Sequence, residues 1–183
     1  LMIIISQSGE TADTLAALRE AKRAGCRVLS VVNVVGSTIA TESDDVLYTW
    51  AGPEISVAST KAYSTQLAVI YLLALYIGEQ LGKFTQEQLS AYIAALEKLP
   101  EQIDEMLKHK ENIQFFASKY FNASDMYFIG RNVDYAASLE ASLKLKEISY
   151  IHSEAYAAGE LKHGPIALLK EGRLVVAAIT QPA

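Results

Sequence analysis

The chain has 183 residues, of which 51% are hydrophobic and 20% are charged, and its formal net charge at pH 7 is −5. This length suits one sizeable domain or pieces of two small ones, and an acidic chain without a basic run is not expected to bind nucleic acid. The single cysteine, Cys26, excludes an internal disulfide framework and predicts a reducing, cytoplasmic compartment.

Membrane insertion is not expected either. The longest apolar run covers residues 67–77, which is too short to span a bilayer. The chain does not begin with the basic and apolar regions of a signal peptide. Because both ends fall inside strand-like patterns, we expect the chain to be a fragment of a longer polypeptide.

The first elements follow a strand–helix–strand pattern. Residues 1–5 are an apolar run that predicts a buried strand, and residues 12–23 carry apolar positions at helical spacing. Further strands are predicted over residues 27–32 and 46–50. Strands separated by helix-length segments predict an α/β fold with parallel sheets flanked by helices.

The turn between the first strand and the first helix is rich in hydrogen-bond donors. Its sequence is Ser6-Gln7-Ser8-Gly9-Glu10-Thr11. Unpaired N–H groups at a helix start favour an anion, so we interpret this turn as a phosphate cradle. The alternative is an ordinary N-cap, for which serine and threonine are common.

The middle of the chain is predicted to be helical. Residues 67–81 are apolar almost all round, which predicts a buried helix, with Gly82 as its C-cap. Ser56, Ser59 and Thr60 at its start either cap the helix or present hydroxyls to a ligand, and the sequence leaves both readings open. Residues 85–99 and 101–120 predict two further helices, the second a linker on which His109 is solvated.

A second α/β unit is predicted from residue 123 onward. It contains a strand over 125–129, a tight turn at 130–132, and a helix over 135–150 that Asp134 caps. Residues 151–158 are predicted to be irregular, residues 159–165 a compact turn or short helix, and residues 173–179 a strand. We therefore divide the chain into units 1–122 and 123–183. The similar segments 4–7 and 178–181 suggest a weak internal repeat.

A second group of chemistry-bearing residues is predicted in that unit. Glu140, Lys144 and Glu147 share one helix face by their spacing. Such a group is more often a surface ion pair, but a glutamate in a partly apolar cleft suits proton abstraction, and His163 suits proton delivery. His152 is interpreted as structural. The histidine and cysteine spacing does not predict a metal site.

Residues 6–14 resemble the phosphosugar-binding signature of sugar isomerase (SIS) domains. The resemblance narrows to the isomerase half of the glutamine–fructose-6-phosphate aminotransferases. It rests on five further segments that cover most of the chain: residues 33–37, 51–55, 57–63, 143–152 and 159–165.

The resemblance implies a function and a set of site residues. Ser6, Gln7, Ser8 and Thr11 would hold the sugar phosphate, while Ser59 and the Val57 backbone would contact the sugar. Glu147 would move a proton between C1 and C2 with Lys144 beside it. His163 would assist ring opening from a neighbouring subunit of a homodimer. The ligands would be fructose 6-phosphate and glucosamine 6-phosphate, held by two SIS units without a cofactor.

The chain also departs from this family. Cys26 does not match the nucleophile of the family's glutaminase domain, and we find neither that domain nor the family's carboxyl-terminal lysine. The fragment alone is therefore expected to be inactive. The alternatives are an SIS deglycase or isomerase of another 6-phosphosugar, and a non-enzymatic phosphosugar sensor.

Overall fold

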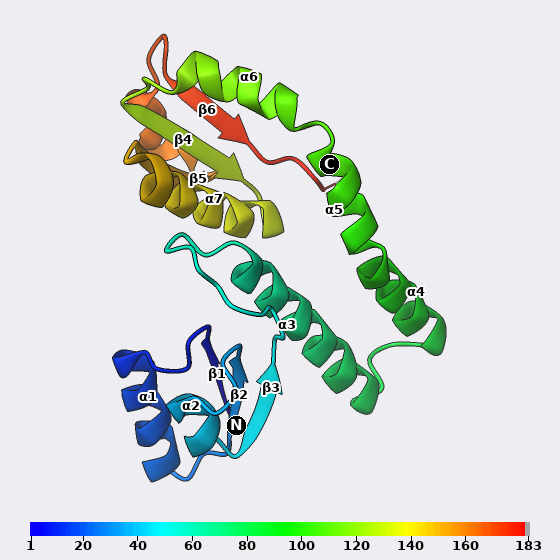
Figure 1. The fold of residues 1–183 in the computed structure, drawn as a ribbon. Coiled ribbons are helices and arrows are strands. Elements are labelled where there is room, and N and C mark those ends of the chain that lie inside the picture. Colours follow the sequence, from blue (N-terminus) through cyan, green and yellow to red (C-terminus); the bar gives the residue numbers. More distant parts are fainter. Residues whose placement is uncertain (182–183) are drawn as a thin grey trace. The chain divides into compact units, whose positions relative to one another are not determined.

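A computed structural model describes residues 1–181 and divides the chain into two compact units. Unit 1 covers Leu1–Glu101, and unit 2 begins at Gln102. Each unit contains one parallel three-stranded sheet (Figure 1). The predicted α/β class with parallel sheets flanked by helices is confirmed. The predicted boundary after residue 122 stays a prediction.

The sheet of unit 1 has the strand order β1-β2-β3. Its strands are β1 (Met2–Ser6), β2 (Val28–Val32) and β3 (Asp45–Tyr48). Helices α1 (Ala12–Arg23) and α2 (Thr38–Glu42) connect them. Ser6 lies in register with Val32, and Val32 with Tyr48. The carboxyl ends of all three strands therefore meet at one edge, where ligands of α/β sheets bind.

The core of unit 1 lies between this sheet and its connecting helices. Leu18, Val28, Val32 and Ile39 are fully buried there, and Cys26 packs partly buried against them. Burying four such side chains is worth about 1.5–3 kcal/mol each. This core fixes the strand ends from which the turns at the carboxyl edge project.

Helix α3 (Lys61–Gln80) corrects the prediction of a buried helix. Of its residues only Ala62 and Gly78 are buried, while Leu72 and Tyr76 are 51% and 61% exposed. Its apolar residues face all directions, and the elements it contacts within unit 1 are mainly α4 and β2. Much of its apolar surface therefore stays uncovered. The predicted C-cap is one residue off: Leu81 is the C-cap, and Gly82 follows it with a φ of +62° while its N–H donates to Glu79 O.

The next helices differ from their predicted bounds. Helix α4 (Gln86–Glu97) begins with the reciprocal capping box of Thr85 and Gln88. The helix predicted over 101–120 is wrong as one element, because it divides into α5 (Leu99–Leu107) and α6 (Lys110–Tyr120). The break falls at Lys108 and His109, and the His109 side chain is 70% exposed, as predicted. Pro100 lies in the first turn of α5, where proline is tolerated.

The sheet of unit 2 has the order β5-β4-β6. Strand β4 (Asp125–Gly130) is central, and β5 (His152–Ala157) and β6 (Leu174–Ala177) flank it. The prediction that residues 151–158 are irregular is wrong. Helix α7 (Val133–Ser149) packs on β4 and β5. A Cβ on Gly130 would lie 2.3 Å from the Asp134 backbone, so glycine permits this close approach.

The predicted compact turn after β5 is confirmed as two short 3-10 helices, η1 (Leu161–His163) and η2 (Pro165–Leu168). Among the described residues, no helix combines the length and apolar character that crossing a membrane requires.

Candidate functional site

The predicted cradle lies between the end of β1 and the start of α1, at the carboxyl edge of the unit 1 sheet (Figure 1). The Ser6 hydroxyl accepts a hydrogen bond from the N–H of Gly9 at 3.0 Å, and the Ser8 hydroxyl accepts one from Glu10 at 3.2 Å. Because each hydroxyl also carries one O–H donor, both can shape the turn and still donate to an anion.

Thr11 occupies the N-cap position of α1, but its side chain makes no cap hydrogen bond. The ordinary N-cap reading therefore does not account for this hydroxyl, which lies on an exposed residue. The N–H of Leu15 donates to Thr11 O, and the N–H groups of the preceding turn have no intrahelical partner. The helix start thus offers backbone donors and a hydroxyl at the same place.

Gly9 is the residue on which the conformation of this turn depends. It has a φ of +68°, and a Cβ there would lie 2.0 Å from the Ser37 Oγ. An L-residue is strained at this φ, and Ser37 is only 3% exposed. The turn consequently needs glycine for two independent reasons.

We predict that Gly9→Ala destabilises the full-length protein by more than about 1 kcal/mol and weakens phosphosugar binding, because both strain and the clash move the turn. Gly25 is a matched control, since it has a φ of +77° and a Cβ added there would meet no atom within 4 Å. Gly25→Ala should show only the backbone cost in urea unfolding and should bind normally. Equal affinity in both variants would contradict the assigned role of the turn.

The segment before α3 carries the two predicted sugar-contacting residues. Val57 is 98% exposed and Ser59 is half-buried. Glu54 caps the helix, because its carboxylate accepts hydrogen bonds from the N–H groups of Thr60 and Ala62. Thr60 makes no side-chain cap bond. The sequence left open whether Thr60 caps this helix or presents its hydroxyl to a ligand, and the structure shows that its side chain does not cap the helix.

Asn33 is a residue that the sequence reasoning missed. Its side-chain oxygen accepts from Thr49 Oγ1 at 3.0 Å and from the Ala51 N–H at 2.9 Å, and its amide donates to Gly52 O at 2.7 Å. Its own N–H donates to Gln7 O at 3.1 Å. Asn33 therefore links the cradle to the loop after β3. Its place directly after a buried strand was the available signal.

The second predicted group lies on α7 of unit 2. Lys144 Nζ is 2.5 Å from Glu147 Oε2 and 3.6 Å from Glu140 Oε1. The pKa of Lys144 is raised, first because Glu147 accepts its hydrogen bond. The shared helix face is therefore confirmed. The Glu147 side chain is 33% exposed, so the fold of unit 2 leaves it accessible to solvent. Its ion-pair partner is the Lys144 ammonium.

His163 ends η1 and is exposed. Its N–H donates to Glu160 O at 3.0 Å. His152 starts β5, where its ring lies 3.5 Å from Asp125 and 3.9 Å from Glu154. This acidic neighbourhood agrees with the structural reading of His152. In the part of the chain that the structure describes, no group of three or more His, Cys, Asp or Glu could hold a metal ion.

Unit 2 has a turn at the end of β4 that corresponds in place to the cradle, but the carboxylate of Asp134, in the first turn of α7, lies beside it. The Asp134 carboxylate accepts hydrogen bonds from the hydroxyl and the N–H of Thr180, which lower the pKa of Asp134. Asp134 thus binds the segment after β6 and is not the N-cap, a position that Asn132 occupies. A buried carboxylate here disfavours an anion.

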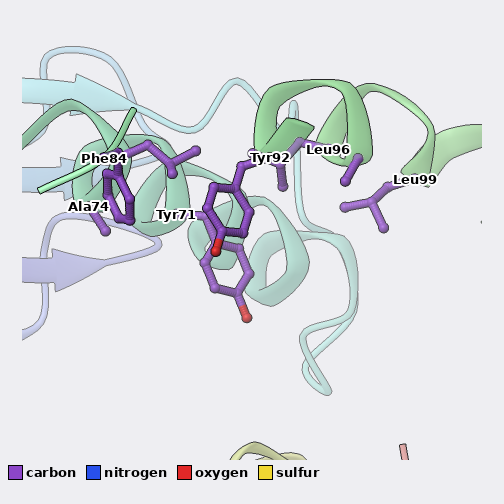
Figure 2. A pocket seen from close by; sticks show the side chains of 8 residues that line it. Tyr71, Ala74, Phe84, Tyr92, Leu96 and Leu99 are labelled. Atoms are coloured by element: carbon purple, nitrogen blue, oxygen red, sulfur yellow. The ribbon is translucent and has the colours of Figure 1, made fainter. Parts of the chain in front are cut away.

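A pocket of about 430 Å³ lies between α3 and α4 (Figure 2). Figure 2 shows Tyr71 and Ala74 from α3 and Tyr92 and Leu96 from α4 around this space, with Phe84 from the connecting loop. The lining contains none of the predicted site residues. The lining is almost entirely apolar, its side-chain polar groups are the hydroxyls of Tyr71 and Tyr92, and it has no charged side chain for a phosphate, so this pocket is not the candidate site.

Comparison with known proteins points to one family. A family model described as "SIS domain" matches residues 1–76 and 119–182. A glutamine–fructose-6-phosphate aminotransferase (isomerizing) of Clostridium tetani is 60% identical over 181 residues, which are 99% of this chain and 30% of that relative. The chain spans about 30% of the length of the curated relatives it matches.

Solved structures give the same fold. The C-terminal domain of glucosamine-fructose-6-phosphate aminotransferase from Francisella tularensis aligns with a TM-score of 0.93 at 41% identity, covering 96% of this chain and 49% of that chain. A glucosamine-6-phosphate deaminase from Thermotoga maritima aligns with a TM-score of 0.72 at 28% identity, covering 96% of this chain and 51% of that chain.

Proposed function

The chain belongs to the SIS domain family, and from this premise we propose that it is the isomerising part of a glutamine–fructose-6-phosphate aminotransferase. The overall reaction would convert fructose 6-phosphate and glutamine-derived ammonia into glucosamine 6-phosphate. The observation that carries the proposal is the 60% identity to the Clostridium tetani relative over 99% of this chain.

The cradle of unit 1 would hold the sugar phosphate. Ser6, Ser8 and Thr11 supply hydroxyl donors, Gln7 supplies an amide, and the start of α1 supplies N–H groups. These donors are neutral, so binding relies on hydrogen bonds and the helix dipole rather than on a lysine or arginine. A phosphate held in this way can leave with the product after each turnover.

Glu147 would be the base that moves the proton between C1 and C2. Lys144 would hold this carboxylate in place, because its Nζ lies 2.5 Å from Glu147 Oε2. Ser59 and the Val57 backbone would contact the sugar. The exposed His163 would assist ring opening, reaching the site from the second subunit of a homodimer in the cytoplasm.

Two alternatives remain distinct from this proposal. One is a deglycase or isomerase of another 6-phosphosugar. The chain is 28% identical to a glucosamine-6-phosphate deaminase and 60% identical to an aminotransferase, so this alternative has the weaker support. The other is a phosphosugar sensor. Binding alone needs no ion-paired glutamate and exposed histidine, so the Lys144–Glu147 pair favours an enzyme.

An assay of the full-length protein separates the three functions. We predict that fructose 6-phosphate and glutamine together give glucosamine 6-phosphate and glutamate, detected by mass spectrometry, and that omitting glutamine or ammonia stops product formation. Conversion of a 6-phosphosugar without a nitrogen donor would support the deglycase or isomerase. Binding without any conversion would support the sensor.

A further inference from the structure

An acidic residue stands inside the cradle, where a bound phosphate would repel it. Glu10 directly follows Gly9 in the turn. Its Oε1 accepts a hydrogen bond from the N–H of Thr38 at 2.7 Å. The carboxylate therefore binds the first residue of α2, and a donor outside the cradle stabilises its charge.

A second hydrogen bond joins the same two segments. The N–H of Ile39 donates to Gly9 O at 2.9 Å. The close approach of Gly9 to the buried Ser37 side chain adds a steric contact beside it. Ser37, Thr38 and Ile39 at the start of α2 thus contact Gly9 and Glu10 of the turn.

The ionisation state of Glu10 suits this contact. The pKa of Glu10 is lowered, first by the hydrogen bond from the Thr38 backbone and then by the Thr38 side chain. The carboxylate is consequently charged near neutral pH, and a charged acceptor makes a stronger hydrogen bond than a neutral one. Thr38 N–H is a donor that α2 itself does not use, because it lies in the first turn.

We propose that Glu10 is a positioning residue that fixes the phosphate-binding turn by accepting a hydrogen bond from the N–H of Thr38, and that it does not itself contact the substrate. This inference rests on the proposed function of the turn. Without the contact, the turn would keep only the Gly9–Ile39 hydrogen bond and the Ser37 contact to the start of α2, and Ser8 to Thr11 would move more freely. The hydroxyl and N–H donors would then have to be ordered again on each binding event.

Two substitutions of Glu10 test the acceptor in the full-length protein. Glu10→Ala removes it, and the Kd for fructose 6-phosphate by calorimetry should rise about tenfold, the effect of losing one charge-assisted hydrogen bond. Glu10→Gln keeps an acceptor oxygen and should restore most of the affinity. The kcat for glucosamine 6-phosphate formation should fall much less than KM rises in Glu10→Ala, because the proposed role of Glu10 is to order the phosphate-binding turn.

Thr38 allows the donor to be removed independently. Thr38→Pro deletes the N–H at the first position of α2, where proline is well accepted. The preceding residue, Ser37, has a φ of −62° and a ψ of 160°, the conformation that a residue before proline adopts. Thr38→Ala is the matched control, because it removes the same side-chain hydroxyl, which also bonds Glu10, but keeps the N–H. Thr38→Pro should weaken binding as Glu10→Ala does, and the double variant should be no weaker than either.

Several results would overturn the proposal. Wild-type affinity in Glu10→Ala would show that the contact is unnecessary. Tighter binding in Glu10→Gln would show that Glu10 acts by repelling the phosphate. Additive losses in Glu10→Ala and Thr38→Pro would show that the two residues act separately. Absence of fructose 6-phosphate binding by the wild-type protein would instead overturn the proposed function, and the role of Glu10 with it.

Discussion

Replacing Glu147 by glutamine in the full-length enzyme is expected to abolish proton exchange at C1 and C2 of the sugar while leaving fructose 6-phosphate binding intact. Glutamine keeps the size of the side chain and an oxygen within reach of Lys144, which lies 2.5 Å from the carboxylate, but it cannot accept the proton. Loss of a general base reduces the rate by about 100- to 10,000-fold. Deuterium incorporation from D2O, followed by NMR, measures the exchange, and calorimetry measures binding.

Glu140 provides a matched control for this experiment. It lies on the same face of α7 and pairs with the same lysine at 3.6 Å, but it is assigned no role in proton transfer. Glu140→Gln should retain most of the exchange. Unchanged exchange in Glu147→Gln would remove Glu147 from the role of base, and loss of exchange in Glu140→Gln alone would transfer the role to Glu140.

Combined replacement of Ser8 and Thr11 by alanine is expected to reduce the affinity for fructose 6-phosphate by about 100-fold or more. Hydrogen bonds to a charged group contribute about 1.5–3 kcal/mol each, and 1.4 kcal/mol corresponds to a tenfold change in affinity. Thr11 makes no cap bond that its loss would break, and Ser8 gives up one exposed bond from the Glu10 N–H, so the fold should persist. Calorimetry with fructose 6-phosphate measures the effect.

Exposed serines outside the cradle control for the loss of hydroxyls. Ser90 on α4 and Ser118 on α6 are both exposed, and their double alanine variant should bind as the wild type does. Intact affinity in Ser8→Ala with Thr11→Ala would show that the cradle assignment is wrong. A similar loss in both double variants would show that hydroxyl removal acts through general destabilisation.

Most strands of the two sheets were predictable from local sequence. Apolar runs such as residues 28–32 become buried strands because a parallel sheet is covered on its faces. Strand β5 was missed because His152, Ser153 and Glu154 are polar. Tertiary contacts decide its state: the hydroxyls of Ser153 and Ser142 lie 2.9 Å apart, both buried, and Ser153 also donates to Ser142 O. Such a pair cannot be read from either segment alone.

The predicted burial of α3 failed for a different reason. An apolar helix predicts that partners exist, but it does not say that they belong to the same unit. Leu72 and Tyr76 stay about half exposed or more. The single helix expected over 101–120 failed at Lys108 and His109, where neither proline nor glycine marks a break. Local propensity there favours continuation, so the sequence carries no signal for the interruption.

The sequence nominates residues for the candidate site but does not show how they support one another. The turn at residues 6–11 and the Lys144–Glu147 pair follow from residue type and spacing. The helix caps do not follow from residue type and spacing, because Glu54 rather than Thr60 caps α3, and Glu10 caps α2. These carboxylates reach across six to 28 residues to bind N–H groups. Nothing in the spacing of the sequence identifies which donor each would find.

A crystal structure of the full-length protein with fructose 6-phosphate would test the central claim most directly. The proposed function predicts that the phosphate binds within hydrogen-bond distance of Ser6, Ser8 and Thr11, with C1 and C2 of the sugar next to the Glu147 carboxylate. A phosphate bound at the cradle with the sugar carbons remote from Glu147 would contradict the isomerase role. A phosphosugar bound elsewhere, with the cradle empty, would contradict the site as a whole.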